Sequence, residues 1–315
     1  MKNKNLSISI LNVNGLKNKL RDNQFLVEHV DPYSFVFFVE TFKEQQSDFN
    51  LNNYNSYHSS RKNRNKKSKR ASGGIAAYIK NDYCHTVQII NSEHDDLMWI
   101  KFKKEFYRID KDLYFCITYV KPEISSHSET DIDTFEILEK EIIKFSMWGH
   151  IMIAGDFNSR IGLLPDYISL DTNIFGNGDP EQVIDNVYNR RFSKDPTVNN
   201  AGKRLIDLCL IHNLKIANGR ALGDMTGNLT CFKYNGNSIV DYFICSEEIF
   251  SKINNFEIKP LTVYSDHCQL VCQFDITVNK QTSIMKKNNI LQKIKPKYKW
   301  DSGAAIRLKH NLSDD

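Results

Sequence analysis

The sequence lacks any long uninterrupted apolar run, which excludes the commonest kind of membrane protein. None of the runs in its 315 residues approaches the roughly 20 apolar residues that a membrane-spanning helix needs. After a polar start, the first apolar segment is about seven residues long, too short for the hydrophobic core of a signal peptide with its cleavage site. We therefore expect an intracellular protein with no membrane partner.

The cysteine pattern of a disulfide-bonded or zinc-bound domain is also missing. There are seven cysteines, an odd number, and they are scattered and mostly lie inside apolar runs. This pattern is typical of reduced thiols in a protein core. Cys268 and Cys272 flank a strand-like segment and could serve as two metal ligands, but no second pair completes a zinc site.

The main body of the chain has no excess of positive charge. The net charge of +4 arises from residues 277–315, which contain nine Lys and Arg against three Asp, whereas residues 1–276 contain 33 basic and 35 acidic residues. Binding of a polyanion over the whole surface is therefore excluded. A local cluster remains at residues 61–70, where seven of ten residues are basic. A solvated loop, a contact with a phosphate backbone and a nuclear localisation signal all stay open for it.

The distribution of apolar residues predicts a strand-rich α/β protein. With 41% hydrophobic and 25% charged residues, the composition is that of an ordinary soluble globular protein. Short runs rich in β-branched and aromatic residues predict strands at residues 6–13, 34–39, 74–79, 97–102, 113–120, 151–154, 239–244 and 268–274. Helical spacing appears at residues 131–148 and 203–212, and more weakly near 22–29. Many strands with few helices indicate two packed sheets flanked by helices.

The end of the strand pattern near residue 276 sets the expected domain boundary. Residues 1–276 are predicted to form one domain, which is within the range that layered α/β domains reach. Residues 163–200 are rich in Asp, Asn, Gly and Pro, lack periodicity, and are predicted to be a long surface loop or insertion. Residues 277–315 are interpreted as a basic linker or as the start of a truncated further domain.

Polar residues at the ends of the predicted strands are the candidates for chemistry. These are Asn14, Glu40, Asp156, Asn158, Asp241, Asp266 and His267. Each alone has an ordinary explanation as a turn former, a helix cap or a buried histidine. Together they predict a cleft, because strand ends gather side chains in layered folds. Four carboxylates repel one another unless a cation neutralises them, and oxygen ligands favour Mg²⁺ or Mn²⁺. Hydrolysis of a phosphodiester requires such a metal, an aligned water and a proton donor.

Seven short motifs, in this order, resemble the endonuclease/exonuclease/phosphatase superfamily. They are Asn-Gly-Leu at 14–16, Glu-Thr at 40–41, Ser-Gly-Gly-Ile-Ala at 72–76, Thr-Tyr-Val around Tyr119, Gly-Asp-Phe-Asn at 155–158, Ser-x-x-Asp-Tyr at 238–242 and Ser-Asp-His at 265–267. The resemblance covers about residues 6–276. It implies a four-layered α/β sandwich, in which two packed, mostly antiparallel sheets are flanked by helices and the site lies at one end.

Within the superfamily, the details are closest to the endonuclease domain of LINE-type (non-LTR) retrotransposons. The Asp-Tyr block at 241–242 resembles that of apurinic endonucleases and retroelement nucleases, and the Trp-x-Asp-Arg pattern of inositol-polyphosphate phosphatases is absent. Residues 214–219 and 229–232 are similar to further LINE blocks, and residues 297–301 resemble the start of a linker to reverse transcriptase. The resemblance implies a monomeric DNA-nicking endonuclease, nuclear or nucleocytoplasmic, with a reverse transcriptase module as partner in the parent element.

Two other functions stay open at this point. One is a phosphatase or phosphodiesterase that acts on a small-molecule or lipid phosphate. The other is a catalytically dead module that binds nucleic acid.

The resemblance also implies a role for each site residue. Glu40 would be the principal ligand of Mg²⁺ (or Mn²⁺), with Asn14 and Asp266 completing or supporting the coordination. Asp156 would align and deprotonate the attacking water, and Asn158 would hold this water or a phosphate oxygen. His267, oriented by Asp241, would donate to the phosphate. Tyr119 would contact the phosphate or the leaving group. DNA contacts are expected from Arg61, Arg64, Lys66, Lys67, Lys69, Arg70, Thr230 and Ser265.

Overall fold

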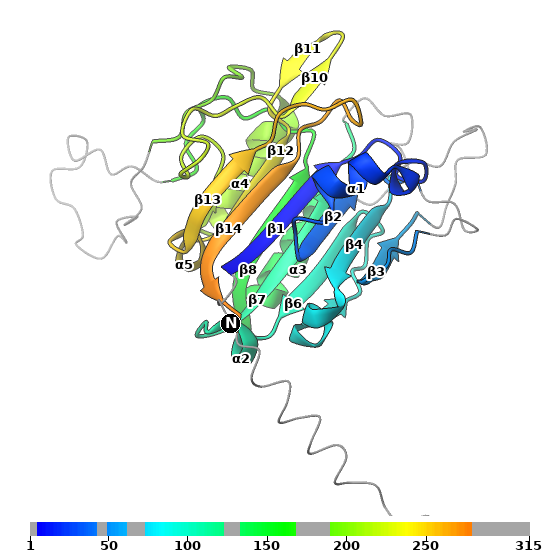
Figure 1. Cartoon of the computed structure of the whole chain (residues 1–315). Helices are drawn as coiled ribbons and strands as arrows, with labels where there is room; N and C mark the ends of the chain where they lie inside the picture. Colours follow the sequence, from blue (N-terminus) through cyan, green and yellow to red (C-terminus); the bar gives the residue numbers. More distant parts are fainter. Residues whose placement is uncertain (1–4, 43–48, 62–72, 123–132, 168–189, 279–315) are drawn as a thin grey trace, which may run out of the picture. The chain divides into compact units, whose positions relative to one another are not determined.

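The computed structural model describes residues 5–42, 49–61, 73–122, 133–167 and 190–278. They form two mixed six-stranded sheets and a separate two-stranded hairpin (Figure 1). The first sheet has the order β13-β14-β1-β2-β4-β3 and consists of β1 (Asn5–Asn12), β2 (Phe35–Val39), β3 (Tyr54–Ser59), β4 (Ile75–Lys80), β13 (Ile253–Ile258) and β14 (Leu270–Thr277). The second has the order β5-β6-β7-β8-β12-β9 and consists of β5 (Val87–Ile90), β6 (Leu97–Phe102), β7 (Asp112–Tyr119), β8 (Gly149–Asp156), β9 (Leu214–Ile216) and β12 (Asp241–Ser246).

The hairpin and the helices complete the described part of the chain. The hairpin consists of β10 (Cys231–Lys233) and β11 (Gly236–Ser238), and it projects from one end of the sheets (Figure 1). The helices are α1 (Asn23–His29), α2 (Lys104–Tyr107), α3 (Thr134–Ser146), α4 (Asn200–Ile211) and α5 (Glu247–Phe250), with 3-10 turns η1 (Lys19–Arg21) and η2 (Asn81–Thr86). In this part of the chain, no helix is both long and apolar enough to cross a membrane.

Alternation along the strands divides the apolar side chains between an inner core and two outer ones. In β2, Phe35 and Phe37 pack in the core between the two sheets, whereas Val36 and Phe38 pack on the outer face with residues of α1. This is the two-residue period of a strand that is buried on both faces. On the second sheet, the outward residues pack against α3 and α4, which gives the order helix, sheet, sheet, helix (Figure 1). The fold is therefore the predicted four-layered sandwich.

The helices begin where a side chain can bind the free backbone amides of the first turn. Asp133 precedes α3 and accepts a hydrogen bond from the backbone of Phe135, and Asn199 precedes α4 and accepts one from Gly202. Asp22 caps α1 in the same way. These caps satisfy donors that a helix N-terminus otherwise leaves unpaired.

All eight predicted strands are strands in the structure, and the three predicted helices correspond to α1, α3 and α4. The sheets are mostly antiparallel, as expected, with β1–β2 and β7–β8 as their parallel pairs. The shorter or more polar strands β3, β5, β9, β10, β11 and β13 were not predicted. The chain divides into Met1–Asn279 and Lys280–Asp315, and the described residues all belong to the first unit. Residues 168–189 of the predicted insertion lie outside the described part.

Candidate active site

The inward-facing side of four strands ends in polar residues at one edge of the sandwich. In β1, Ile8 and Ile10 belong to the core between the sheets, and Asn12 is the next residue with the same orientation. The same alternation leads to Tyr119 in β7, Asp156 in β8 and Asp241 in β12. Asp156 pairs in register with Tyr119 on one side and with Asp241 on the other. The pleat of the strands therefore brings these polar groups together.

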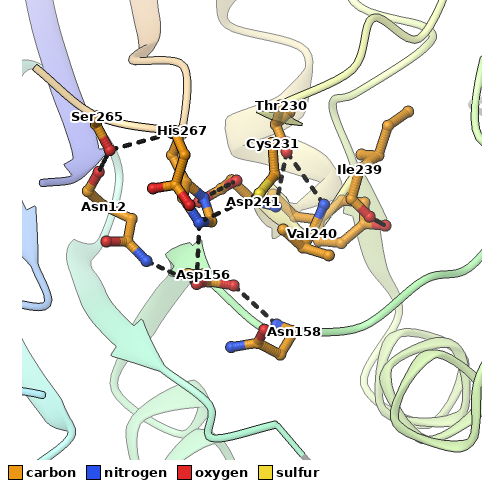
Figure 2. Close-up of polar contacts among 12 residues, drawn as sticks. Asn12, Asp156, Asn158, Thr230, Cys231, Ile239, Val240, Asp241, Ser265 and His267 are labelled. Atoms are coloured by element: carbon orange, nitrogen blue, oxygen red, sulfur yellow. Dashed lines mark hydrogen bonds and ion pairs between the residues drawn. The ribbon is translucent and has the colours of Figure 1, made fainter. Parts of the chain in front are cut away.

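His267 is held by the carboxylate of Asp241 (Figure 2). Its Nδ1 atom lies 2.8 and 3.1 Å from the two carboxylate oxygens, and its Nε2 atom lies 4.0 Å from Asp156. Burial lowers the pKa of His267, but the neighbouring Asp241 outweighs it and raises the pKa to about 12. The imidazole is therefore cationic, and both ring nitrogens carry a proton.

Asp156 is the most buried carboxylate of the group. It accepts hydrogen bonds from the side-chain amide of Asn12 at 2.8 Å and from the backbone of Asn158 at 2.9 Å (Figure 2). Burial and the negative charge of Asp241 raise its pKa to about 7, against the opposing effect of cationic His267. A pKa near neutrality suits a group that takes a proton from water.

Glu40 and Tyr119 face each other at the same edge. The Tyr119 hydroxyl forms a hydrogen bond with Glu40, and burial together with the charges of Glu40 and Asp156 raises the pKa of Tyr119 above its ordinary range. Tyr119 is therefore a neutral hydroxyl at physiological pH. The guanidinium of Arg61 lies 5.6 Å from the centre of the Tyr119 ring, a cation–π distance.

Three predicted site residues have a left-handed backbone, which residues other than glycine rarely adopt. The φ angles are 44° for Asn14, 54° for Glu40 and 47° for Asn158. Such strained conformations cluster at functional sites. The side-chain amide nitrogen of Asn14 also donates a 3.3 Å hydrogen bond to the carboxylate of Asp266, so these two side chains face each other.

The donor set fits a metal ion. Among the described residues, the ligand atoms of Asp156, Asp241 and His267 lie within 4.8 Å of one another, as do those of Cys231, Asp266 and His267. The first of these groups is acidic and buried, and Glu40 adds a further negative charge that acts on Asp156.

Comparison with solved structures shows a known fold for the chain. No protein-family model and no curated protein matches the sequence. Among solved structures, AP endonuclease LMAP from Leishmania major has a TM-score of 0.59 at 14% identity, covering 86% of this chain and 88% of that chain. The 3′ phosphatase NExo from Neisseria, bound to product DNA hairpin, has a TM-score of 0.57 at 15% identity, with coverages of 86% and 99%. The endonuclease domain of TRAS1, a telomere-specific non-LTR retrotransposon, has a TM-score of 0.54 at 13% identity, covering 86% of this chain and 98% of that chain.

The chain has the endonuclease/exonuclease/phosphatase fold. In this fold, the polar edge of the chain is built from both sheets, because Asn12 and Glu40 come from the first and Tyr119, Asp156 and Asp241 from the second. His267 comes from the segment between β13 and β14.

Three of the residues expected to contact DNA have other roles in this endonuclease/exonuclease/phosphatase fold. Arg61 binds the fully buried carboxylate of Asp96 through Nε at 3.0 Å and Nη2 at 2.7 Å, so its guanidinium forms an internal ion pair. The Thr230 hydroxyl is buried and accepts hydrogen bonds from the backbone of Val240 and Asp241. In the structure, ion pairing with Asp96 engages Arg61, and burial with two backbone hydrogen bonds engages Thr230.

Ser265 also connects parts of the site. Its hydroxyl donates to the backbone carbonyl of Asn12 at 2.7 Å and accepts from the backbone N–H of His267 at 3.1 Å (Figure 2). The serine thereby positions His267 relative to β1. The other residues expected to contact DNA, Arg64, Lys66, Lys67, Lys69 and Arg70, lie outside the described residues.

Three further residues belong to the site and were not singled out from the sequence. Asn12 could have been found, because it continues the inward face of β1. Cys231 lies 3.4 Å from Nε2 of His267, and Lys233 follows two residues later. Burial lowers the pKa of Lys233, but electrostatic interactions with its neighbours, among them the carboxylates of Asp266, Asp156 and Glu40, raise it above the ordinary value. The sequence marked this segment only through the resemblance of residues 229–232 to a LINE block, and β10 is too short to predict as a strand.

Proposed function

We propose that the protein is a metal-dependent phosphodiesterase that nicks DNA. The observation that carries the proposal is the pair formed by cationic His267 and buried Asp156, in which Nε2 of the ring lies 4.0 Å from a carboxylate oxygen. Their pKa values, about 12 and about 7, are displaced in the same direction by their shared surroundings. A ring that stays cationic can donate hydrogen bonds to a phosphate, and the neighbouring carboxylate, which titrates near neutrality, can accept a proton from water.

Each of the chain's own groups has a task in this reaction. Asp156 orients a water molecule and accepts its proton, and Asn12 keeps the carboxylate in place through its 2.8 Å hydrogen bond. His267 donates hydrogen bonds to the phosphate oxygens, where negative charge develops, and Asp241 keeps it cationic. The neutral Tyr119 hydroxyl contacts the phosphate or the leaving oxygen, and the ammonium of Lys233 attracts the phosphodiester.

The metal ligands we propose are Glu40, Asn14 and Asp266. Their hard oxygen atoms suit Mg²⁺ or Mn²⁺, and the surrounding negative charge requires a cation. When bound, such an ion polarises a phosphoryl oxygen and stabilises the leaving group. Calorimetric titration of Mg²⁺ into the Glu40→Gln and Asp266→Asn variants tests these ligands, because each substitution removes one negative charge. Wild-type affinity in both variants would contradict the assignment.

DNA is the proposed substrate for two reasons. The first is the Asp-Tyr block at 241–242, and the second is that the solved structures with this fold include an AP endonuclease and a phosphatase bound to product DNA hairpin. The likeness to the TRAS1 endonuclease domain supports an origin in a non-LTR retrotransposon, with a reverse transcriptase as partner of the parent element. We further propose a monomeric domain ending near residue 276 and a nuclear or nucleocytoplasmic location.

A nicking assay on supercoiled plasmid tests the activity. With Mg²⁺ we expect conversion to the open circle, and with a chelator we expect none. Parallel reactions contain a duplex with an abasic site, a 3′-phosphorylated hairpin and an inositol polyphosphate. Release of phosphate from the inositol compound without plasmid nicking would favour a small-molecule phosphatase. Absence of hydrolysis on all substrates by a folded protein would favour a binding module.

A further inference from the structure

The buried thiol of Cys231 lies at the polar edge of the sandwich, in contact with His267. Its Sγ atom lies 3.4 Å from Nε2 of His267, the nitrogen that faces away from Asp241 (Figure 2). The backbone supports this contact, because Cys231 and His267 form an isolated β-bridge. The next residue, Phe232, donates a 2.8 Å hydrogen bond to the carbonyl of Asp266. Three different ligand types thus meet, namely a thiol, an imidazole and a carboxylate.

The spacing of these groups is that of a tetrahedral metal centre. In such a centre, Zn–S bonds of about 2.3 Å and Zn–N bonds of about 2.0 Å place sulfur and nitrogen about 3.5 Å apart. The observed separation is 3.4 Å, and the carboxylate of Asp266 lies within 4.8 Å of both atoms. The hydrogen bond from His267 Nδ1 to Asp241 is also the contact that orients a zinc-bound histidine and increases its basicity.

We propose that Cys231, Asp266 and His267 form an inhibitory binding site for Zn²⁺. Thiolate and imidazole ligands favour Zn²⁺ strongly over Mg²⁺, so this site is chemically distinct from the hard-oxygen site around Glu40. On binding, the thiol and Nε2 release their protons to solvent, and the three groups take three of the four coordination positions. The fourth position is left for water or for a substrate oxygen.

Inhibition follows because the two sites share residues with the reaction. Zn²⁺ occupies Nε2 of His267, which can then no longer donate to the phosphate, and it engages Asp266, which we assign to Mg²⁺. This part of the inference rests on the proposed phosphodiesterase function. Binding of Zn²⁺ itself does not depend on that function, and it is therefore measured separately.

The binding experiment uses Co²⁺ as a spectroscopic probe of the metal-free protein. We expect a thiolate-to-Co²⁺ charge-transfer band that saturates at one equivalent and disappears when Zn²⁺ is added. Cys231→Ser should abolish the band and lower the Co²⁺ affinity by at least about 100-fold. The matched control is Cys84→Ser, because Cys84 lies on η2 and donates to the carbonyls of Ile79 and Lys80. That control should bind Co²⁺ as the wild type does.

Two results would overturn the site. One is a wild-type protein without the charge-transfer band at stoichiometric Co²⁺, and the other is a band that persists in Cys231→Ser. Asp266→Asn provides a second variant at a less buried position, and it should retain the band while weakening Zn²⁺ binding. An unchanged Zn²⁺ affinity in Asp266→Asn would show that the carboxylate of Asp266 is not a ligand of this site.

The inhibition experiment measures plasmid nicking at constant excess Mg²⁺ with increasing Zn²⁺. Each protein is compared with its own rate without Zn²⁺, so a change of basal rate in Cys231→Ser does not affect the result. Stoichiometric Zn²⁺ should lower the rate of the wild type and of Cys84→Ser by roughly tenfold or more, and that of Cys231→Ser far less. Equal inhibition of all three would contradict the inhibitory role. A protein that binds Co²⁺ through Cys231 but nicks no DNA would contradict the proposed function alone.

Discussion

The side-chain amide of Asn12 donates a 2.8 Å hydrogen bond to the carboxylate of Asp156, and this bond joins the two sheets at the polar edge of the sandwich. Asn12 ends β1 of the first sheet and Asp156 ends β8 of the second. The side-chain oxygen of Asn12 also accepts a 3.2 Å hydrogen bond from the backbone N–H of Asn14. One buried amide therefore connects the proposed base with the strand end that leads to a proposed metal ligand.

Asn12→Ala should lower kcat strongly, and the free energy of unfolding should fall less than the barrier to catalysis rises. A hydrogen bond to a charged group contributes about 1.5–3 kcal/mol, which corresponds to roughly a 10- to 100-fold lower kcat if the carboxylate loses its orientation. Steady-state kinetics and thermal unfolding of the same preparation measure both effects. The control is Asn91→Ala, an exposed position between β5 and β6. Unchanged kcat in Asn12→Ala would show that Asp156 is held well enough without the amide.

Asp241→Asn should remove the positive charge of His267 at neutral pH. Asp241 is the main influence that raises the pKa of His267 to about 12 against the opposing effect of burial. With a neutral amide in its place, the imidazole should titrate far lower, and kcat should fall by at least about 100-fold, the usual contribution of a hydrogen-bond donor to developing negative charge. NMR titration of the His267 ring in the metal-free protein gives the direct readout. A ring that stays protonated in the variant would mean that other groups hold the charge.

Arg61→Gln should destabilise the fold and leave the salt dependence of DNA binding unchanged. The guanidinium pairs with Asp96, whose carboxylate is fully buried, and loss of a partner from such a pair costs about 3 kcal/mol. The free energy of unfolding measures this loss, with the exposed Arg21→Gln as control. In contrast, replacing Lys66, Lys67 and Lys69 by Ser should lower the slope of log K against log salt by roughly 0.9 for each lost phosphate contact. A flatter slope in Arg61→Gln would restore it as a DNA contact.

Much of the fold could be predicted from the sequence because its central strands are buried on both faces. Continuous apolar runs such as Phe35–Val39 give an unambiguous strand signal, and they end at the polar residues that the fold gathers. The two-residue alternation of a strand would also have identified Asn12, because it points to the same side of β1 as Ile8 and Ile10 but is polar. The order of the motifs gave the superfamily fold before any contact was known.

The rest depends on contacts that no local pattern encodes. The strand β3 is only partly buried, so its sequence lacks the apolar alternation that predicts a strand. Arg61 belongs to a basic cluster in the sequence, and the structure pairs it with Asp96, 35 positions away. The proximity of Cys231 to His267 likewise requires the bridge between two distant segments.

Lys233→Gln should weaken binding of duplex DNA. The ammonium of Lys233 lies in the field of Asp266, Asp156 and Glu40, which raise its pKa against the effect of burial, so it stays charged. Removing one phosphate contact should raise KM and lower the salt slope by roughly 0.9. The exposed Lys111→Gln, near α2, is the control. Equal salt slopes in Lys233→Gln and wild type would mean that this lysine neutralises the carboxylates and not the DNA.

Asp156→Asn should stabilise the metal-free protein at neutral pH, and the gain should depend on pH. Burial and the charge of Asp241 raise the pKa of Asp156 from 3.8 to about 7 in the folded state. Between these two values the folded protein binds more protons at this site than the unfolded chain, so this group's contribution to stability falls as the pH rises. Below pH 3.8, Asp156 is protonated in both the folded and the unfolded protein, and its contribution to stability is fully present.

The asparagine side chain does not titrate, so the difference in stability between variant and wild type reports the titration of Asp156 together with its effect on His267 and the neighbouring carboxylates. Denaturant unfolding in a chelator, from about pH 5 to about pH 8, should show that the advantage of Asp156→Asn grows until about pH 7 and then levels off. Excess Mg²⁺ should reduce the advantage, because a bound cation offsets the repulsion that the wild-type carboxylate experiences from its acidic neighbours. A stability difference that is the same at every pH would mean that Asp156 is ionised in the folded protein throughout this range, and His267 would then have a fully charged partner 4.0 Å away.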